Sequence, residues 1–212
     1  MSATLPAPSK EDIVAEFRRR SIIQAACHVF GEKGFEAATV DAIAEAAHVA
    51  KGTVYLYYAS KQAIYDAVFA SGMAEIERLI GEQLAAAGSA RAAIAAFVTV
   101  RAEYFQQHPD FFRVYVAEIA RLVAASPESR GACQAALDRQ TRALQKVMEK
   151  AVAAGEVRPV DPEAAALAVF DMSKGLIGRR LLLGTRGGSH KDITFLTDLI
   201  WSGLKPARGQ KK

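Results

Sequence analysis

The chain has 212 residues, of which 51% are hydrophobic and 24% charged, so it is long enough for one or two globular domains and too apolar for wholesale disorder. Its longest stretch without a charge, residues 21–31, is far shorter than the ~18 residues of a membrane span, and its two cysteines give neither a disulfide framework nor a CxxC metal site. The net charge of +4 allows an anionic partner, although residues 1–70 carry nearly equal numbers of basic and acidic side chains, seven and eight. We therefore expect a cytoplasmic protein with no membrane span, no metal and no other cofactor.

The residue pattern predicts an all-α fold. Alanine is abundant throughout, and each of the seven prolines can be placed at a helix edge. Gly34 is typical of a helix C-terminus, whereas Thr39 and Ser60 are typical N-caps. In chain order, we expect nine helices at 9–32, 39–47, 50–57, 60–85, 90–107, 109–124, 127–154, 162–184 and 191–204.

Residues 39–61 predict a helix-turn-helix followed by a third, capped helix. Val40, Ile43 and Ala44 give the first short helix an apolar face, and Val54 lies in the helix that packs against it. Small alanines in this segment let the two helices cross closely, as a helix-turn-helix requires.

The second short helix has a surface suited to DNA. Lys51, Gly52 and Thr53 lie at its N-terminal end, and Tyr55 and Tyr57 lie farther along its outer side. Helix N-terminal amides, a lysine and several hydroxyls favour phosphate contacts. Gly52 removes a side chain where backbone can approach another surface.

Residues 10–69 resemble the DNA-binding domain of the tetracycline-repressor (TetR/AcrR) family of bacterial transcription regulators. The segments that carry the resemblance are AACHVFGEKGF (25–35), TVDAIA (39–44), KGTVYLYY (51–58) and SK (60–61). The resemblance implies a nine-helix TetR-like fold with a helix-turn-helix domain at 9–68 and a helical ligand-binding and dimerisation domain at 69–206. It also implies a homodimer that binds a double-stranded operator with an inverted repeat and responds to a small-molecule effector.

The resemblance also implies roles for individual residues. Thr53 and Tyr55 are expected in or beside the major groove, and Tyr58 is expected to pack inward. The predicted DNA-binding set is Thr39, Lys51, Gly52, Thr53, Tyr55, Tyr57 and Lys61, with Thr39, Tyr57 and Lys61 on the phosphate backbone. Three positions depart from the family pattern: His48 replaces the usual turn glycine, Ala50 a common serine and Leu56 a frequent histidine. Histidine tolerates a left-handed conformation better than most residues do.

The helices after residue 90 carry apolar stripes that predict a mostly apolar cavity, which suits a hydrophobic or aromatic effector. The expected lining residues are Phe97, Arg101, Tyr104, Phe112, Tyr115, Glu118 and Gln140. Two interpretations of Arg101 are open: it anchors an acidic ligand, or it forms an internal ion pair with Glu118, which we favour.

The last helix is apolar on several sides, which predicts that a second copy of the chain covers it. The expected dimerisation residues are Leu196, Leu199, Ile200 and Leu204.

These observations predict a ligand-responsive DNA-binding regulator, with repression expected and activation left open. The alternative is a helical small-molecule-binding module or enzyme that retains a helix-turn-helix. No catalytic constellation supports an enzyme, because Glu45 and His48 form only one copy of a motif that di-iron sites need twice. The run Arg18–Arg20 is either a solvated helix face or a DNA contact, and Cys133 is either a redox sensor or an inert buried thiol.

Overall fold

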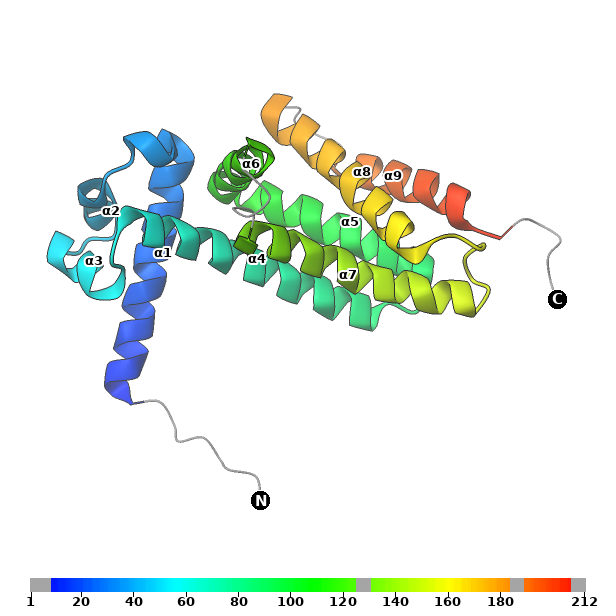
Figure 1. Ribbon diagram of the computed structural model, residues 1–212, viewed down its shortest axis with the longest axis horizontal. Helices are drawn as coiled ribbons and strands as arrows, with labels where there is room; N and C mark the ends of the chain where they lie inside the picture. Colours follow the sequence, from blue (N-terminus) through cyan, green and yellow to red (C-terminus); the bar gives the residue numbers. More distant parts are fainter. Residues whose placement is uncertain (1–8, 125–130, 184–188, 207–212) are drawn as a thin grey trace, which may run out of the picture. The chain divides into compact units, whose positions relative to one another are not determined.

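A computed structural model describes residues 9–124, 131–183 and 189–206. These residues form nine α-helices and no strand (Figure 1). The helices are α1 (Lys10–Ala37), α2 (Val40–Ala46), α3 (Lys51–Tyr57), α4 (Lys61–Ala86), α5 (Ala90–Gln107), α6 (Pro109–Ala124), α7 (Gly131–Ala153), α8 (Pro162–Leu183) and α9 (Ser189–Leu204). The predicted all-α fold is confirmed. The predicted start of the seventh helix at 127 and the predicted end of the eighth at 184 lie outside the described residues.

The helix boundaries follow local signals in the sequence. Ser9 caps α1 in a reciprocal capping box with Asp12, and the Thr39 hydroxyl caps α2 by accepting a hydrogen bond from the Ala42 amide at 3.1 Å. Gly34 was expected to end the first helix, and it does interrupt α1, with a φ of 74° that glycine adopts readily. One further helical stretch follows this kink before the chain reaches Thr39.

The chain divides into two compact units. Unit 1 contains the chain up to Ser71 together with Asp110–Ala117, and unit 2 contains Gly72–Pro109 and the chain from Glu118 onward. Helices α4 and α6 therefore each contribute residues to both units. No pattern in the sequence predicts that part of α6 belongs to unit 1.

An aromatic cluster forms part of the core of unit 1. Tyr65 of α4 packs edge-on against Phe30 and Phe35 of α1, with 5.1 Å between ring centroids in each pair. Nearby, Phe69 of α4 meets Phe111 of α6 at 6.4 Å. Such aromatic pairs contribute beyond their buried area, so they hold α1, α4 and this part of α6 together.

Helix α1 also meets the beginning of α6 through polar contacts. The His28 Nδ1 atom lies 2.9 Å from Asp110 Oδ2, and Arg113 pairs with both Asp110 and Glu32. The backbones approach so closely that a Cβ added to Gly31 would lie 2.8 Å from the Asp110 Cα. Glycine at this position therefore permits the contact between the two helices.

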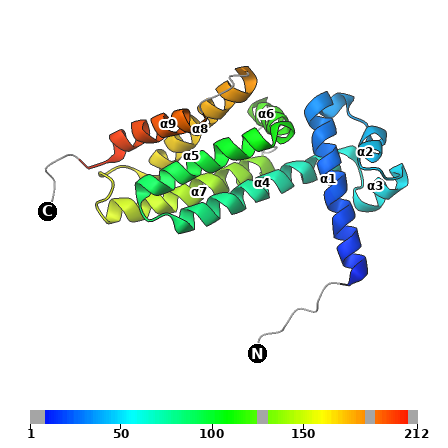
Figure 2. The ribbon, with the colours of Figure 1, turned by 180° about the vertical axis from the view of Figure 1, so that it is seen from behind.

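Unit 2 is a bundle of long helices, and Figure 2 shows α5, α7, α8 and α9 running alongside one another. Helix α8 packs on α5, α7 and α9, and α5 packs on α7 and α9. The fully buried side chains include Ile94 and Phe97 of α5 and Leu144 and Met148 of α7. Within the described ranges, no helix is long and apolar enough to cross a membrane.

Candidate functional site

Helices α2 and α3 meet in a tight turn centred on His48. His48 has a φ of 54°, a left-handed conformation that is uncommon for a residue other than glycine, so the expectation for this turn is confirmed. The Val49 amide donates to the Ala44 carbonyl at 3.0 Å and closes the end of α2. Ile43 and Val54 are fully buried, so each helix is anchored on its inner side.

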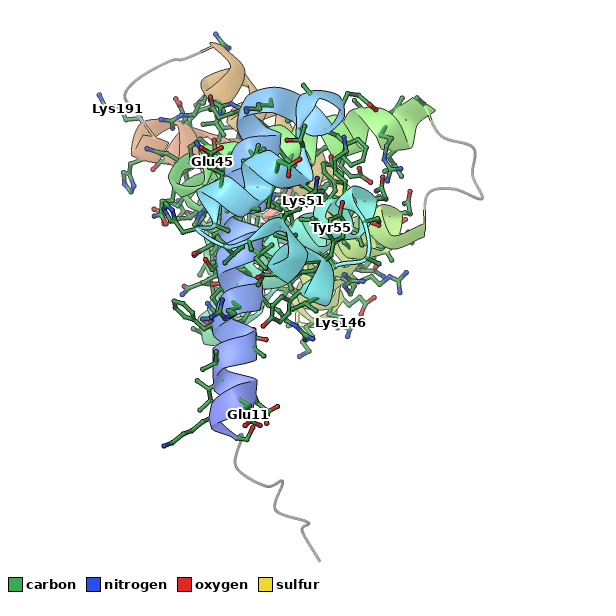
Figure 3. All side chains as sticks on the ribbon, turned by 90° about the vertical axis from the view of Figure 1, so that its left-hand side faces the viewer. Glu11, Glu45, Lys51, Tyr55, Lys146 and Lys191 are labelled. Carbon is green, nitrogen blue, oxygen red and sulfur yellow. The ribbon has the colours of Figure 1, made fainter. Side chains whose placement is uncertain are left out.

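The outer side of α3 is open to solvent. Lys51, Gly52 and Tyr55 are exposed, whereas Thr53 and Tyr57 are half-buried. Figure 3 shows Lys51 and Tyr55 on this surface, with Glu45 on the neighbouring α2. A Cβ at Gly52 would meet no atom within 4 Å, so packing inside the protein does not require glycine there. The absence of a side chain leaves the backbone open to an outside surface.

Lys51 forms an ion pair that the sequence analysis missed. Its ammonium donates to the Asp41 carboxylate of α2 at 2.9 Å. This hydrogen bond and the charge of Asp41 raise the pKa of Lys51, which stays positively charged. Asp41 and Lys51 are ten residues apart on different helices, so no spacing rule in the sequence could reveal the pair.

Lys61, predicted to contact a phosphate, is engaged inside unit 1. Its ammonium donates to the carbonyl oxygens of Phe35, Glu36 and Ala38 at 2.8, 3.2 and 3.1 Å, and it lies 4.5 Å from the centre of the Phe35 ring. A lysine ammonium has three N–H donors, and all three are used here. Lys61 thus ties the start of α4 to the end of α1, and this engagement competes with the phosphate contact, which stays a prediction.

Arg19 of α1 reaches the recognition helix. Its guanidinium lies 5.7 Å from the centre of the Tyr57 ring, within the range of a cation–π contact. Tyr58, predicted to pack inward, is half-buried, and burial raises its pKa. Of the three consecutive arginines, Arg19 thus lies beside a predicted DNA contact.

Arg101 of α5 is completely buried in unit 2. Its Nε donates to the Ser173 hydroxyl at 3.0 Å, and its Nη1 donates to the Gln140 side-chain oxygen. The guanidinium also lies 4.2 Å from the centre of the Phe170 ring. Ser173 and Phe170 come from α8, which the sequence analysis had not connected to Arg101.

Glu118 has a different partner from the one expected. It forms a two-pronged ion pair with Arg121 one turn along α6, at 2.6 and 2.9 Å. This corrects the favoured Arg101–Glu118 pair, since the structure gives each group its own hydrogen-bonding partners.

The predicted ligand-binding residues fall into both units. Phe112 and Tyr115 belong to unit 1, and the other five belong to unit 2. All seven are buried. A cavity of about 450 Å³ in unit 2 lies between α4 and α5 and includes Tyr104, and its lining mixes apolar residues such as Leu79 and Val100 with polar ones.

The predicted dimerisation residues differ in their burial. Leu196, Ile200 and Leu204 are buried within the single chain, whereas Leu199 is 50% exposed. Leu196, Ile200 and Leu204 are therefore covered largely by their own chain, and the role of all four residues in a dimer interface stays a prediction. Among the described side chains of α8 and α9, the large apolar ones that are exposed are Leu167, Met172, Phe195 and Leu199.

Neither cysteine has the environment of a reactive thiol. Burial raises the pKa of both Cys27 and Cys133 to about 11, with Asp110 adding to the effect on Cys27 and Glu118 to that on Cys133. Within the described parts of the chain, no group of three or more His, Cys, Asp or Glu side chains could hold a metal ion.

A helix-turn-helix with an exposed recognition helix, joined to a helical bundle, defines a DNA-binding regulator. Two models of known families agree with this class. Residues 22–68 match "Bacterial regulatory proteins, tetR family", and residues 87–177 match "Tetracyclin repressor-like, C-terminal domain". The chain belongs to the TetR family of bacterial transcriptional regulators.

Curated relatives and solved structures agree with this assignment. The chain is 23% identical to the HTH-type transcriptional regulator YhgD of Bacillus subtilis, over 76% of this chain and 82% of that protein. It is 28% identical to the transcriptional repressor KstR2 of Rhodococcus jostii, over 56% and 58%. Its fold is similar to that of FadR from Bacillus subtilis in complex with stearoyl-CoA, with a TM-score of 0.76, 20% identity, and coverage of 87% and 98%. These relatives are regulators and not enzymes, as the sequence predicted.

Proposed function

We propose that this protein is a homodimeric cytoplasmic repressor that binds an inverted-repeat operator and leaves it when a hydrophobic small molecule binds. The observation that carries the proposal is the exposed outer side of α3, which is held in place by the buried Val54 and by the turn at His48. We assign DNA binding to residues 9–68, and effector binding and dimerisation to residues 69–206.

On this surface, Thr53 and Tyr55 are the candidates for reading base edges, because they lie on the outer side of α3 near its N-terminal end. Thr39, Tyr57 and the backbone at Gly52 are the candidates for phosphate contacts. We add Arg19, whose charge is held next to Tyr57. Lys61 acts by positioning α4 and not by touching DNA.

The effector would bind in unit 2, whose core combines many apolar side chains with a few polar groups such as Arg101 and Gln140. This composition supports a hydrophobic or aromatic molecule over a sugar or a nucleotide. The solved structure of FadR contains stearoyl-CoA, which makes long-chain acyl compounds the first class to test.

Release from DNA would follow from a population shift. An effector that prefers one spacing of the two recognition helices depletes the spacing that fits successive major grooves. Helix α6 contributes residues to both units and meets α1 at Asp110, so a displacement of α6 would reach the DNA-binding unit. A near-complete switch needs roughly 5 kcal/mol of differential binding.

The dimer would form through the apolar side chains that α8 and α9 leave exposed. Phe195 is 70% exposed, and Leu167, Met172 and Leu199 are between 44% and 50% exposed. Exposed apolar side chains on neighbouring helices are typical of an interface with a second copy.

Fluorescence anisotropy with duplexes from the DNA flanking its own gene tests the proposal. We expect dimeric, sequence-specific binding at an inverted repeat, and weaker binding when palmitoyl-CoA or another acyl compound is added. If binding never exceeds that to random-sequence DNA, the protein is instead a helical small-molecule-binding module that retains the helix-turn-helix.

A further inference from the structure

We infer that Asp41 is a specificity-determining residue, which lowers the affinity for non-specific DNA by holding Lys51 in an ion pair on the recognition surface. The inference rests on the proposed DNA-binding function. It starts from the 2.9 Å contact between the Lys51 ammonium and the Asp41 carboxylate. Both side chains are more than half exposed, so the pair lies on the surface and is not part of the core.

Because few other charges surround it, this ion pair largely determines the positive charge that the recognition surface can offer to DNA. Lys51 is the single lysine or arginine between residues 40 and 57, whereas Asp41 and Glu45 are both acidic. Asp41 and Glu45 are four residues apart on α2, so they share one exposed side of that helix. Figure 3 shows Glu45 on α2 and Lys51 on the adjacent α3. Helices α2 and α3 together therefore carry no excess positive charge.

The affinity of proteins for non-specific DNA comes almost entirely from cations that replace the counterions of the phosphates. Lys51 contributes little to this non-specific affinity while Asp41 neutralises the charge of its ammonium group. If Lys51 moved to a phosphate, the Asp41 carboxylate would be left unpaired beside the polyanion. Lys61 adds nothing, because its three hydrogens are bonded to backbone carbonyls.

Apart from Arg19, the groups that remain on the surface are directional. The Thr53 and Tyr55 hydroxyls and the backbone at Gly52 bind well only when the DNA presents matching atoms. Weakening the electrostatic attraction to phosphates while keeping these contacts widens the ratio between the affinity for operator DNA and the affinity for random DNA. This ratio determines occupancy in a genome, where non-specific sites are in large excess.

The test uses a random-sequence 30-bp duplex and fluorescence anisotropy at salt concentrations from 50 to 300 mM. We compare the full-length protein with Asp41→Asn, Lys51→Met and the double variant, and confirm by circular dichroism that each is folded. Asp41→Asn is expected to steepen the salt dependence by about 0.9 in the log–log slope and to tighten binding about fivefold at 0.15 M salt, because one more phosphate is neutralised.

Glu45→Gln is the matched control, since it removes the same charge one helical turn away. The gain from Asp41→Asn should disappear in the double variant, because Lys51 is what supplies it. The gain from Glu45→Gln should be smaller and should leave the salt slope unchanged.

Two results would overturn the inference: Asp41→Asn binding random DNA like the wild type, or a gain that persists without Lys51. Wild-type protein that binds no duplex from the DNA flanking its own gene more tightly than the random-sequence duplex would instead refute the proposed function itself.

Discussion

Replacing Gly31 with alanine tests how closely α1 and α6 approach each other. The added Cβ would lie 2.8 Å from both the Cα and the Cβ of Asp110 and 2.9 Å from its carbonyl oxygen. Ordinary carbon contacts begin near 3.4 Å. Two of the three atoms belong to the backbone, so no side-chain rotation can remove the clash, and the helices must separate.

The expected change in the free energy of unfolding follows from two opposing effects. Overpacking at such a contact costs about 1–3 kcal/mol. Alanine recovers about 1 kcal/mol through its better helix propensity. The nearby ion pair between His28 and Asp110 is partly exposed and adds little. The net loss should therefore lie between about 0 and 2 kcal/mol, localised in unit 1.

Gly81→Ala is the control, because Gly81 lies in α4 with no atom within 4 Å of an added Cβ. It should stabilise the protein by about 0.5–1 kcal/mol through helix propensity alone. Hydrogen exchange measured by mass spectrometry reports local stability. Gly31→Ala should speed exchange in peptides from α1 and from residues 109–117. If Gly31→Ala instead slows exchange as Gly81→Ala does, the close approach is refuted.

Three further predictions address other contacts. Lys61→Met should lower the free energy of unfolding by about 1–3 kcal/mol, because three charge-assisted hydrogen bonds are lost, and should leave the salt slope of DNA binding unchanged; a slope lowered by about 1 would return Lys61 to the DNA interface. Leu199→Glu should give folded monomers in sedimentation, whereas Leu196→Glu should lower the melting temperature because that side chain is buried in one chain. Cys27 and Cys133, with pKa values near 11, should react with iodoacetamide at pH 8 more slowly in the native than in the unfolded protein. Because the folded thiols hold their protons more tightly, the free energy of unfolding should fall as the pH rises from about 9 to about 11.

Features that depend on neighbouring residues could be predicted from the sequence. Thr39 caps α2 through an amide three residues away, and Gly34 interrupts α1 because glycine accepts a positive φ. His48 takes the left-handed position in the turn, and Val54 is buried as the apolar pattern required. Each of these follows from chemistry within a few residues, which is why the helix-turn-helix could be located before its geometry was known.

Features that depend on distant parts of the chain could not be predicted from the sequence. Lys61 binds carbonyl groups 23 to 26 residues earlier, and a carbonyl acceptor has no signature in a side-chain pattern. Arg101 was expected to meet a carboxylate, but its hydrogen bonds go to Gln140 and Ser173 on two other helices. An apolar face also does not reveal whether its own chain or a second copy covers it, so the burial of Leu196 within a single chain could not be predicted.

The division of α6 between the two units has a consequence for how the protein is made. Phe111 packs against Phe69, and the Val114 carbonyl accepts a hydrogen bond from the Tyr65 hydroxyl at 3.5 Å. Both partners in α4 are synthesised more than forty residues before Phe111 and Val114. The DNA-binding unit is thus complete only when residue 117 has emerged, by which time α5 has also been made. A fragment that stops at residue 71 would leave Phe69 without Phe111, so the core of unit 1 is completed midway through synthesis of the chain.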